Sequence, residues 1–188
     1  MSKSFFPNKI ALVGHAYSGK SSTAREISRR YGHKIISLAS PIKEVDWAFS
    51  FLGIPSENKA RKRKLYHVLG IWARKQDPKF FINMLERNYW REIYDQDEKV
   101  VVDDCRFINE AIFFALNYFT LIYIDCPKDV LYKRAFENGE DPDELYSYES
   151  EQEIEEIVKT FDLLKVSGVA DVKVAVDKLE AEIRSRIS

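Results

Sequence analysis

The segment GHAYSGKS at residues 14–21 constrains the fold of this chain more than any other part of its sequence. It has the spacing G-x-x-x-x-G-K-S and follows a short apolar run, KIALV, at residues 9–13. A loop of this kind wraps backbone N–H groups around the phosphates of a nucleotide when it joins a strand to the start of a helix. The apolar run predicts the strand and residues 20–31 predict the helix, so that the N–H groups and the helix dipole face the anion. The sequence therefore predicts a phosphate loop, with a chance match in a glycine turn as the alternative.

Six residues are expected to contact the nucleotide, namely Gly14, Ser18, Gly19, Lys20, Ser21 and Ser22. The lysine is expected to bridge the β- and γ-phosphates, and Ser21 to ligate Mg²⁺ through its hydroxyl. ATP as the phosphate donor and Mg²⁺ are therefore the expected cofactors. The motif leaves open whether the phosphoryl group passes to water, to a hydroxyl or to another phosphate.

Other parts of the sequence narrow the choice among ATPases, GTPases and kinases. GTPases need a base-reading N-K-x-D turn, but the two Asn-Lys pairs here, Asn8-Lys9 and Asn58-Lys59, lack the aspartate two residues later. At 188 residues the chain is also short for a motor or helicase core. The small size favours a metabolite or nucleotide kinase.

Short apolar runs alternate with longer helical patterns along the chain. Further strands are expected at 34–38, 99–103, 119–125 and 160–166. Further helices are expected at 41–53, 58–75, 78–95, 107–117, 128–137 and 169–187. Strands that alternate with helices indicate βαβ units. The expected fold class is therefore α/β, with a parallel sheet of about five strands and helices on both faces.

The composition fits one domain of ordinary globular type. The chain has 45% hydrophobic and 31% charged residues and a net charge of −1, so its total charge predicts neither nucleic-acid nor membrane binding. No stretch reaches the ~20 apolar residues of a membrane span, and the N-terminal segment lacks the apolar core of a signal peptide. Cys105 and Cys126 lack the spacing of metal ligands, which fits buried free thiols. We expect a cytoplasmic protein (in the host cytoplasm if it is viral), a monomer or homodimer, with small-molecule partners and no membrane.

Two local charge biases depart from this balance. The segment KARKRK (59–64) has five basic residues in six, whereas residues 137–156 carry ten acids and no Lys or Arg. Each is interpreted as a solvated helix face or loop. The basic run could instead contact a nucleic-acid backbone, so a nucleotide-binding module or slow ATPase on nucleic acid is an alternative function.

A second chemical motif is VVVDDCRF (100–107), in which a β-branched strand runs into two carboxylates and an arginine. Ligands of doubly wound sheets bind at the carboxyl ends of the strands. Asp103 and Asp104 are therefore candidate Mg²⁺ partners, because hard cations prefer carboxylate oxygen. Arg106 is placed to bind an anionic acceptor through its planar fork. If the acceptor were a hydroxyl, one of the two aspartates would have to act as a base; a capped helix start with a structural ion pair is the alternative.

A third group lies on one face of a predicted helix. Arg63, His67, Gly70 and Arg74 follow one another at spacings of four, three and four residues. Two arginines that flank a small residue could bind a phosphate and leave room for a ligand. A structural histidine and ordinary surface arginines are the alternative.

Further segments in this order carry a family resemblance. Behind the phosphate loop come ASPIKE (39–44), RKLYHVLGIWARKQDP (63–78), DDCRFINEA (103–111) and YESE (148–151). With the loop, they resemble the bacteriophage-type deoxynucleoside monophosphate kinases, which have A-x-P-L-K, R-x-L-L-Q-x-x-G, D-V-R-F-x-N-E and S-E segments. The resemblance spans nearly the whole chain. It implies the P-loop nucleoside monophosphate kinase fold, a three-layer arrangement with a helical substrate-binding insertion and a short lid, and transfer of the γ-phosphate of ATP to a (deoxy)nucleoside monophosphate.

The resemblance also implies boundaries and residue roles. Residues 1–188 would form one kinase domain, with the core at 1–38, 96–136 and 157–188, the substrate-binding helical region at 39–95 and the lid at 137–150. The positions that match the family motifs are Lys20, Ser21, Lys43, Arg63, Arg74, Asp104 and Arg106, and also His67, where the family usually has Gln. The implied acceptor-binding residues are Lys43, Arg63, His67, Arg74 and Arg106, and the implied catalytic residues are Lys20, Asp104, Arg106 and Arg134.

The sequence departs from this family in two places. Kinases of this type bring arginines from the lid onto the transferred phosphoryl group, but residues 137–147 are acidic, which leaves Arg134 as the best candidate, with Lys133 beside it. KVSG (165–168) replaces the Asn usual before the final helix. Similar segments occur in animal-type phosphomevalonate kinases, and a dephospho-coenzyme A kinase-like activity is a further alternative. The base and the sugar of the acceptor stay open, since five aromatics could stack on a base: Trp47, Trp72, Phe80, Phe81 and Trp90.

Overall fold

Five short apolar runs form a parallel sheet in the computed structural model, which describes residues 6–44, 51, 53 and 59–187. The strands are β1 (Lys9–Val13), β2 (Lys34–Ile36), β3 (Val100–Cys105), β4 (Thr120–Asp125) and β5 (Leu164–Ser167). They lie in the order β2-β3-β1-β4-β5, and every pairing among them is parallel. The α/β fold class with a parallel sheet of about five strands is therefore confirmed.

The central strand β1 and the first half of the neighbouring strand β3 are buried on both faces of the sheet. Every residue of β1 is buried, and Val100, Val101 and Val102 of β3 are fully buried. Continuous β-branched runs suit a parallel sheet that is covered on both sides, because neither face meets water. Lys9 is the polar exception in β1, and its ammonium donates to the carbonyl of Ile93.

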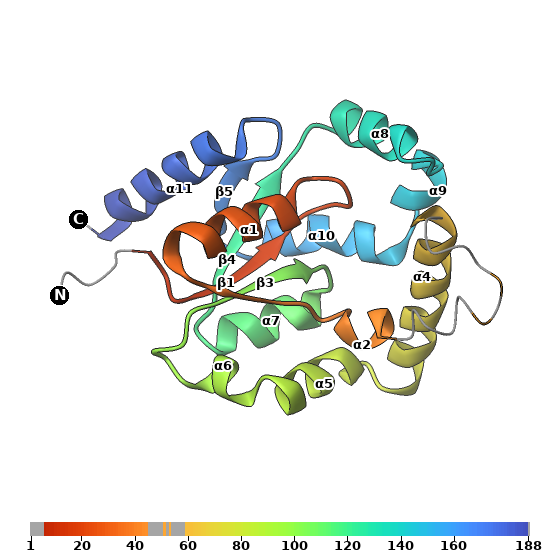
Figure 1. Ribbon diagram of the computed structural model, residues 1–188, viewed down its shortest axis with the longest axis horizontal. Helices are drawn as coiled ribbons and strands as arrows, with labels where there is room; N and C mark the ends of the chain where they lie inside the picture. The colour runs from red at the N-terminus through yellow and green to blue at the C-terminus, as the bar shows by residue number, and fades with distance from the viewer. Residues whose placement is uncertain (1–5, 45–50, 52, 54–58, 188) are drawn as a thin grey trace.

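Helices cover both faces of this sheet (Figure 1). One face packs against α1 (Lys20–Tyr31) and α11 (Val172–Ile187), which contribute Ile27 and Leu179 to a shared apolar core. The other face packs against α7 (Ile108–Leu116) and α10 (Glu149–Thr160). The helices α4 (Lys59–Gln76), α5 (Phe80–Asn88) and α6 (Trp90–Tyr94) extend this second core. The three-layer arrangement matches the predicted P-loop kinase fold.

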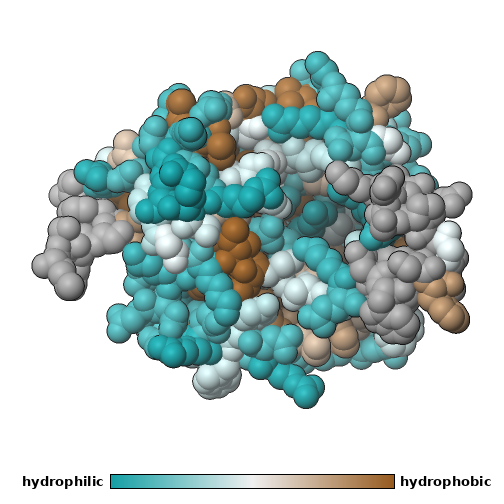
Figure 2. Space-filling model, in the orientation of Figure 1, coloured by the Kyte–Doolittle hydropathy of each residue, from teal (hydrophilic) through white to brown (hydrophobic). Residues whose placement is uncertain are grey.

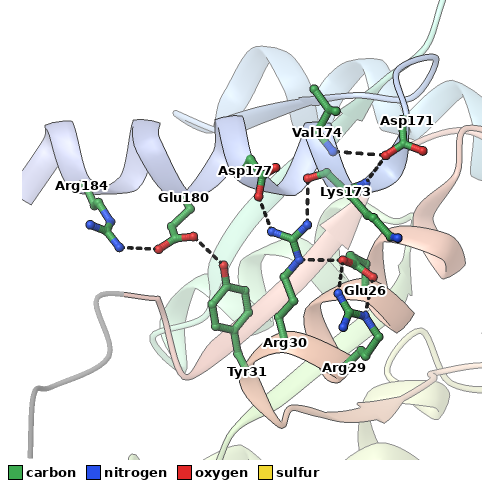
Figure 3. Close-up of polar contacts among 10 residues, drawn as sticks. All are labelled: Glu26, Arg29, Arg30, Tyr31, Asp171, Lys173, Val174, Asp177, Glu180 and Arg184. Atoms are coloured by element: carbon green, nitrogen blue, oxygen red, sulfur yellow. Dashed lines mark hydrogen bonds and ion pairs between the residues drawn. The ribbon is translucent and has the colours of Figure 1, made fainter.

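A polar seam joins the helix after the phosphate loop to the last helix of the chain (Figure 3). Arg30 donates to Glu26 Oε1 at 2.6 Å, to the Lys173 carbonyl at 3.0 Å and to Asp177. The next residue, Tyr31, donates from its hydroxyl to Glu180 Oε2 at 2.9 Å, and Glu180 lies about one turn after Asp177 in α11. These bonds fix α1, and with it the phosphate loop, to the C-terminal part of the chain.

Several expected boundaries were wrong. The helix expected at 78–95 is two helices, because Tyr89 leaves the helical conformation (φ −135°, ψ 37°) and packs against the core. The strand expected at 34–38 ends at Ile36, and the strand expected at 99–103 continues to Cys105. The helix expected at 41–53 begins as α2 (Ser40–Lys43), and most of its remainder lies outside the described residues.

The acidic stretch holds more structure than expected. After α8 (Lys128–Glu137), it forms α9 (Pro142–Tyr146) and enters α10, and neither of these helices was predicted. Asp141 caps α9 by accepting from the backbone N–H groups of Asp143 and Glu144. The last strand begins at Leu164 rather than 160, since residues up to Thr160 belong to α10.

The face of the molecule in Figure 2 is mainly hydrophilic, with hydrophobic residues in separate small areas. Among the helices in the described part of the chain, none combines the length and the apolar character needed to cross a membrane.

Candidate active site

The phosphate loop joins β1 to α1, as its sequence predicts. A Cβ atom at Gly14 would lie 2.9 Å from Ser18 Oγ and 3.2 Å from the carbonyl oxygen of Ile124, so a larger residue would displace the neighbouring strand. Gly19 has a φ of 106°, in the region that favours glycine, and immediately precedes α1. No described side chain caps the N-terminus of α1, so its first backbone N–H groups stay available to an anion.

Lys20 holds its ammonium inside this loop. The residue is 6% exposed, and its ammonium donates to the carbonyl oxygens of Gly14 at 2.5 Å and His15 at 2.6 Å. Burial, and then the charge of Arg106, lower the pKa of Lys20 to about 7, although the nearby carboxylate of Glu151 acts in the opposite direction. A phosphate in the loop would compensate the cost of burying this charge.

Ser21 and Asp103 present oxygens that suit a hard cation. The Ser21 hydroxyl donates to Asp103 Oδ2 at 3.0 Å, while Asp103 Oδ1 is buried and has no hydrogen-bond partner among the described residues. Burial, and then the charge of Asp104, raise the pKa of Asp103. No group of three or more His, Cys, Asp or Glu side chains in the described part of the chain could hold a metal ion. The pair still fits Mg²⁺, which usually takes one or two protein ligands and completes its shell with water and phosphate oxygens.

Asp104, predicted as a metal ligand and catalytic residue, has a different set of contacts. Its carboxylate accepts from the backbone N–H of Leu38 at 2.8 Å, from that of Ala39 at 3.0 Å, and from the hydroxyl of Ser37. Lys43 in turn donates to the Ser37 hydroxyl at 3.0 Å. Asp104 therefore anchors the loop after β2, and the partner-free oxygen at the end of β3 belongs to Asp103.

Arg74 is fixed on three sides. Its guanidinium lies between the rings of Phe81 (4.3 Å to the centroid) and Phe107 (3.8 Å), and its Nη2 donates to Glu110 Oε1 at 2.7 Å. The other oxygen of Glu110 accepts from the backbone N–H groups of Arg106 at 3.0 Å and Phe107 at 3.2 Å. Glu110 therefore orients both Arg74 and the segment after β3. It is 2% exposed, so bulk water does not compete for these hydrogen bonds.

Arg106 points from the end of β3 toward α10. Its Nη1 donates to Glu151 Oε1 at 2.8 Å. The second oxygen of Glu151 accepts from the Ala16 N–H at 3.0 Å and contacts His15 Nδ1 at 3.1 Å. This buried carboxylate thus lies between the phosphate loop and the arginine.

The other predicted residues of α4 lie closer to the acidic stretch. Arg63 Nε pairs with Glu140 Oε1 at 2.8 Å, and its guanidinium lies over the ring of Tyr17 at 4.6 Å. His67 stacks on Tyr148 with centroids 3.6 Å apart. Burial, and then the charges of Arg106 and Arg74, lower the pKa of His67.

Arg134 approaches the phosphate loop from α8. Its Nη1 donates to the Tyr17 carbonyl at 3.0 Å, and it lies 3.7 Å from Cys126 Sγ. Lys133, the neighbour considered with it, is 76% exposed and lies 3.9 Å from Glu137. Of these two basic residues, Arg134 is the one that reaches the loop.

The phosphate loop, the end of β3 and arginines of α4 and α8 line one cleft of about 890 Å³. The predicted site residues that line it are Gly19, Lys20, Ser21, Ser22, Lys43, Arg63, His67, Arg74, Asp103, Asp104, Arg106 and Arg134. Gly14 and Ser18 are buried in the loop itself. Among the described lining residues, seven are Lys or Arg and three are Asp or Glu, which favours anionic ligands.

Four further residues belong to the lining of the cleft or contact it, and no sequence pattern gives them a role. Glu110 and Glu151 occur in the segments DDCRFINEA and YESE, but neither was given a role. Tyr17 lies within the phosphate loop and Glu140 in the acidic stretch, but no motif assigns either a role. The sequence signal for these acids is weak. Glu110 lies four residues after Arg106 at the start of a predicted helix, and Glu140 and Glu151 lie in the acidic stretch that is expected to be solvated. Of the aromatics considered for base stacking that fall within the described residues, only Phe81 lines the cleft.

Comparisons with solved structures support the fold. The chain matches shikimate kinase from Aquifex aeolicus with a TM-score of 0.52 and 18% identity, covering 95% of this chain and 97% of that one. It matches deoxyadenosine kinase from M. mycoides with bound dATP at a TM-score of 0.53 and 17% identity, covering 94% and 98%. It matches a gluconokinase from Sinorhizobium meliloti 1021 with a TM-score of 0.51 and 16% identity, and the match covers 96% of this chain and 93% of that one. At these identities the likeness concerns the fold.

Sequence comparisons give the family. No curated protein sequence matches this chain. The model of a family described as "AAA domain" matches residues 10–157, which include the phosphate loop, the end of β3 and most of α10. Because this match covers more than half of the 188 residues, the chain belongs to the AAA domain family.

Proposed function

We propose that the protein transfers the γ-phosphoryl group of ATP to the phosphate of a nucleoside monophosphate, with deoxynucleotides as the expected class. One observation carries the proposal. Lys20 of the phosphate loop and the arginines Arg74 and Arg106 line the same cleft, and each arginine is held by a buried glutamate. The names of the structural neighbours, a shikimate kinase, a gluconokinase and a deoxyadenosine kinase, agree with a small-molecule phosphotransferase.

The donor side would be built on the phosphate loop. The N–H groups at the start of α1 and the ammonium of Lys20 would bind the β- and γ-phosphates. Arg134 would lie on the same side, since it contacts the Tyr17 carbonyl. Ser21 and Asp103 would hold Mg²⁺, which when bound neutralises phosphate charge. These cations would stabilise the negative charge that spreads over the transferred phosphoryl group in the transition state.

The acceptor side would be built on the arginines. Their forks suit bidentate contacts with a phosphate, and their glutamate partners fix them before a ligand arrives. An oxygen of the acceptor phosphate attacks the γ-phosphorus, and the bond to the β–γ bridging oxygen breaks to release ADP. The second pKa of a monophosphate is near 6, roughly a unit below neutral pH, so the acceptor needs no base.

We also propose the division of the chain that the family resemblance implies. Residues 39–95 would form the acceptor-binding region and 137–150 a lid, while 1–38, 96–136 and 157–188 would form the core. Support comes from α4, which carries Arg63, His67 and Arg74 into the cleft, and from the contacts of α4 with the stretch that contains α9.

A hydroxyl acceptor is the second candidate, and one observation favours it. Asp103 Oδ1 is buried without a partner in the described part of the chain, and burial raises the pKa of this carboxyl. A carboxylate in that state could accept a proton from a hydroxyl. This alternative covers dephospho-coenzyme A kinase-like chemistry, whereas a phosphomevalonate kinase-like activity would use a phosphate acceptor.

A coupled assay for ADP production tests the proposal. The panel contains the common nucleoside and deoxynucleoside monophosphates, phosphomevalonate and dephospho-coenzyme A, and ATP alone measures background hydrolysis. We expect turnover with at least one deoxynucleoside monophosphate, well above the background. Turnover with dephospho-coenzyme A alone would favour the hydroxyl acceptor, and turnover with phosphomevalonate alone would replace the nucleotide by that metabolite. If ATP hydrolysis rises only with nucleic acid, the binding-module alternative would stand instead.

A further inference from the structure

The side chain of Glu151 is one of the most enclosed charged groups in the molecule. It lies in the first turn of α10 and is 1% exposed. Arg106 Nη1 donates to its Oε1, and the Ala16 N–H donates to its Oε2. His15 Nδ1 also contacts Oε2 and donates to it when that nitrogen carries the proton. A carboxylate is the side chain that accepts on both oxygens, so it suits this position better than any neutral group.

Glu151 and its partners come from three different parts of the chain. Ala16 and His15 belong to the phosphate loop, Arg106 follows β3, and Glu151 itself begins a helix that packs against α7. The carboxylate therefore connects the loop that would bind ATP with the arginine that would bind the acceptor. Attraction from Arg106 and the bonds from the loop outweigh burial and lower the pKa of Glu151 to about 2, so the group stays ionised.

We infer that Glu151 is a positioning residue that holds the phosphate loop and the acceptor-side arginine in one fixed arrangement. This inference rests on the proposed function for the role of Arg106, but not for the contact with the phosphate loop. Phosphoryl transfer depends on placing two phosphates in line, and a displacement of about 1 Å can cost roughly 100-fold in rate. A single carboxylate bonded to both sides is a direct way to set that distance.

Glu110 provides a matched comparison within the same protein. It is also a buried glutamate that holds one arginine on one oxygen and backbone N–H groups on the other. Its backbone partners belong to residues 106 and 107, not to the phosphate loop. A general effect of disturbing a buried glutamate should appear in both residues, whereas an effect on ATP should appear only for Glu151.

The substitution Glu151→Gln separates the two sides of the contact. Glutamine has the same shape, but its amide has one accepting oxygen and one donating nitrogen. The charge of Arg106 attracts the amide oxygen, so the NH₂ group faces the phosphate loop and the Ala16 N–H loses its acceptor. A hydrogen bond to a charged group is worth about 1.5–3 kcal/mol, or about 10- to 150-fold in affinity.

Calorimetric titration of the full chain with ATP and Mg²⁺, without an acceptor, is the first test. We expect Glu151→Gln to weaken ATP binding about tenfold or more, and Glu110→Gln to stay within about twofold of the parent protein. Unchanged ATP affinity in Glu151→Gln, or an equal loss in both variants, would overturn the inference. In the assay with a nucleoside monophosphate, Glu151→Gln should raise the KM for both substrates, and Glu110→Gln only that for the acceptor. If no monophosphate is a substrate, the proposed function fails while the titration with ATP still decides the role of Glu151.

A second measurement leaves Glu151 in place, in case its replacement prevents folding. Hydrogen exchange of the Ala16 amide, followed by NMR, reports on the bond to Glu151. Removing Arg106 should loosen the carboxylate, so Arg106→Ala should lose protection at this amide. Arg74→Ala, which frees Glu110 instead, should keep it. Equal protection at the Ala16 amide in both variants would contradict the inference.

Discussion

Lys20 is the residue whose replacement tests the phosphate loop most directly. Lys20→Ala should reduce kcat about 100- to 1000-fold, because the ammonium that meets the developing charge is lost while the backbone N–H groups remain. The protein should stay folded, since burial of this charge is unfavourable, as its lowered pKa of about 7 indicates. Steady-state kinetics and thermal unfolding measure the two effects.

A control for this variant comes from another buried lysine. Lys9 is 3% exposed, and its ammonium bonds to the carbonyl of Ile93, outside the cleft lining. Lys9→Met should change the unfolding temperature and leave kcat nearly unaltered. Near-normal turnover of Lys20→Ala, or an equal loss of turnover in Lys9→Met, would refute the assignment of the phosphate loop.

At this scale, the sequence predicts many of the residues that line the cleft but not the buried glutamates that contact them. The glycines, Lys20 and Ser21 follow from a motif whose spacing is set by the shape of a phosphate. Glu151 follows from no local spacing, because it contacts residues more than forty positions away. Glu110 lies four residues after Arg106, but the arginine that it orients, Arg74, lies 36 positions away. The contacts of Asp104 could not be predicted either. Its oxygens accept from backbone N–H groups of the loop after β2, and no sequence pattern indicates that this loop lies next to β3.

Among the elements, the acidic stretch shows why charge alone misleads. Residues 137–156 were expected to be solvated or a lid, yet they contain α9 and the start of α10, whose Ile154 and Ile157 are fully buried. The spacing of these two isoleucines was the available helical signal. The basic run in α4 and the acidic stretch contact one another through Arg63–Glu140 and Lys64–Glu144.

These two ion pairs should differ in their contribution to stability. Glu140 is 5% exposed and also accepts from the hydroxyl of Tyr17, whereas Glu144 is 41% exposed. Glu140→Gln should lower the free energy of unfolding by about 1–2 kcal/mol, discounted because Arg63 can reach water. Glu144→Gln should produce no measurable change. Urea denaturation compares them, and an equal loss in both variants would show that burial does not decide the strength of these pairs.

For the whole molecule, the parallel sheet explains why a single cleft gathers so many groups. The phosphate loop follows β1, Asp103 and Arg106 lie at the end of β3, and Gly168 follows β5, all at the same edge of the sheet. A Cβ atom at Gly168 would lie 2.4 Å from the Ser18 carbonyl oxygen, so this loop packs directly on the phosphate loop. The alternation of strands and helices predicted this edge. The strand order and the close packing of its loops needed the structure.

His33 lies at the opposite edge, where stability can be tested apart from the site. It follows α1 and precedes β2, is 2% exposed, and its Nε2 lies 2.8 Å from the Pro7 carbonyl. The carbonyl must accept, so Nε2 carries the proton, while Nδ1 is buried without a hydrogen-bond partner among the described residues. The rings of Phe6 and Tyr31 meet its ring edge to face. A second proton, on Nδ1, would therefore be buried without an acceptor.

Burial lowers the pKa of His33 below its ordinary value of 6.5, the carbonyl of Pro7 opposes this, and the charge of Lys99 adds to it. The unfolded chain thus binds this proton more readily than the folded chain, so stability should fall as the pH drops below 6.5 toward the folded pKa. Each unit of depression is worth about 1.4 kcal/mol once the pH is below both values. His67, whose pKa is also lowered, acts in the same direction, whereas the raised pKa values of Asp103 and Glu110 act in the opposite one.

The contribution of His33 is isolated by comparing two proteins across the same pH range. His33→Gln keeps a donor for the Pro7 carbonyl and cannot take up a proton. Urea denaturation at pH 7.5, 6.5, 5.5 and 5.0 should show the parent protein losing stability relative to this variant as the pH falls. Lowered carboxyl pKa values, such as that of Glu26 at about 2, affect stability mainly below this range. Parallel pH profiles for the two proteins would mean that His33 accepts its second proton as easily in the folded state as in the unfolded chain.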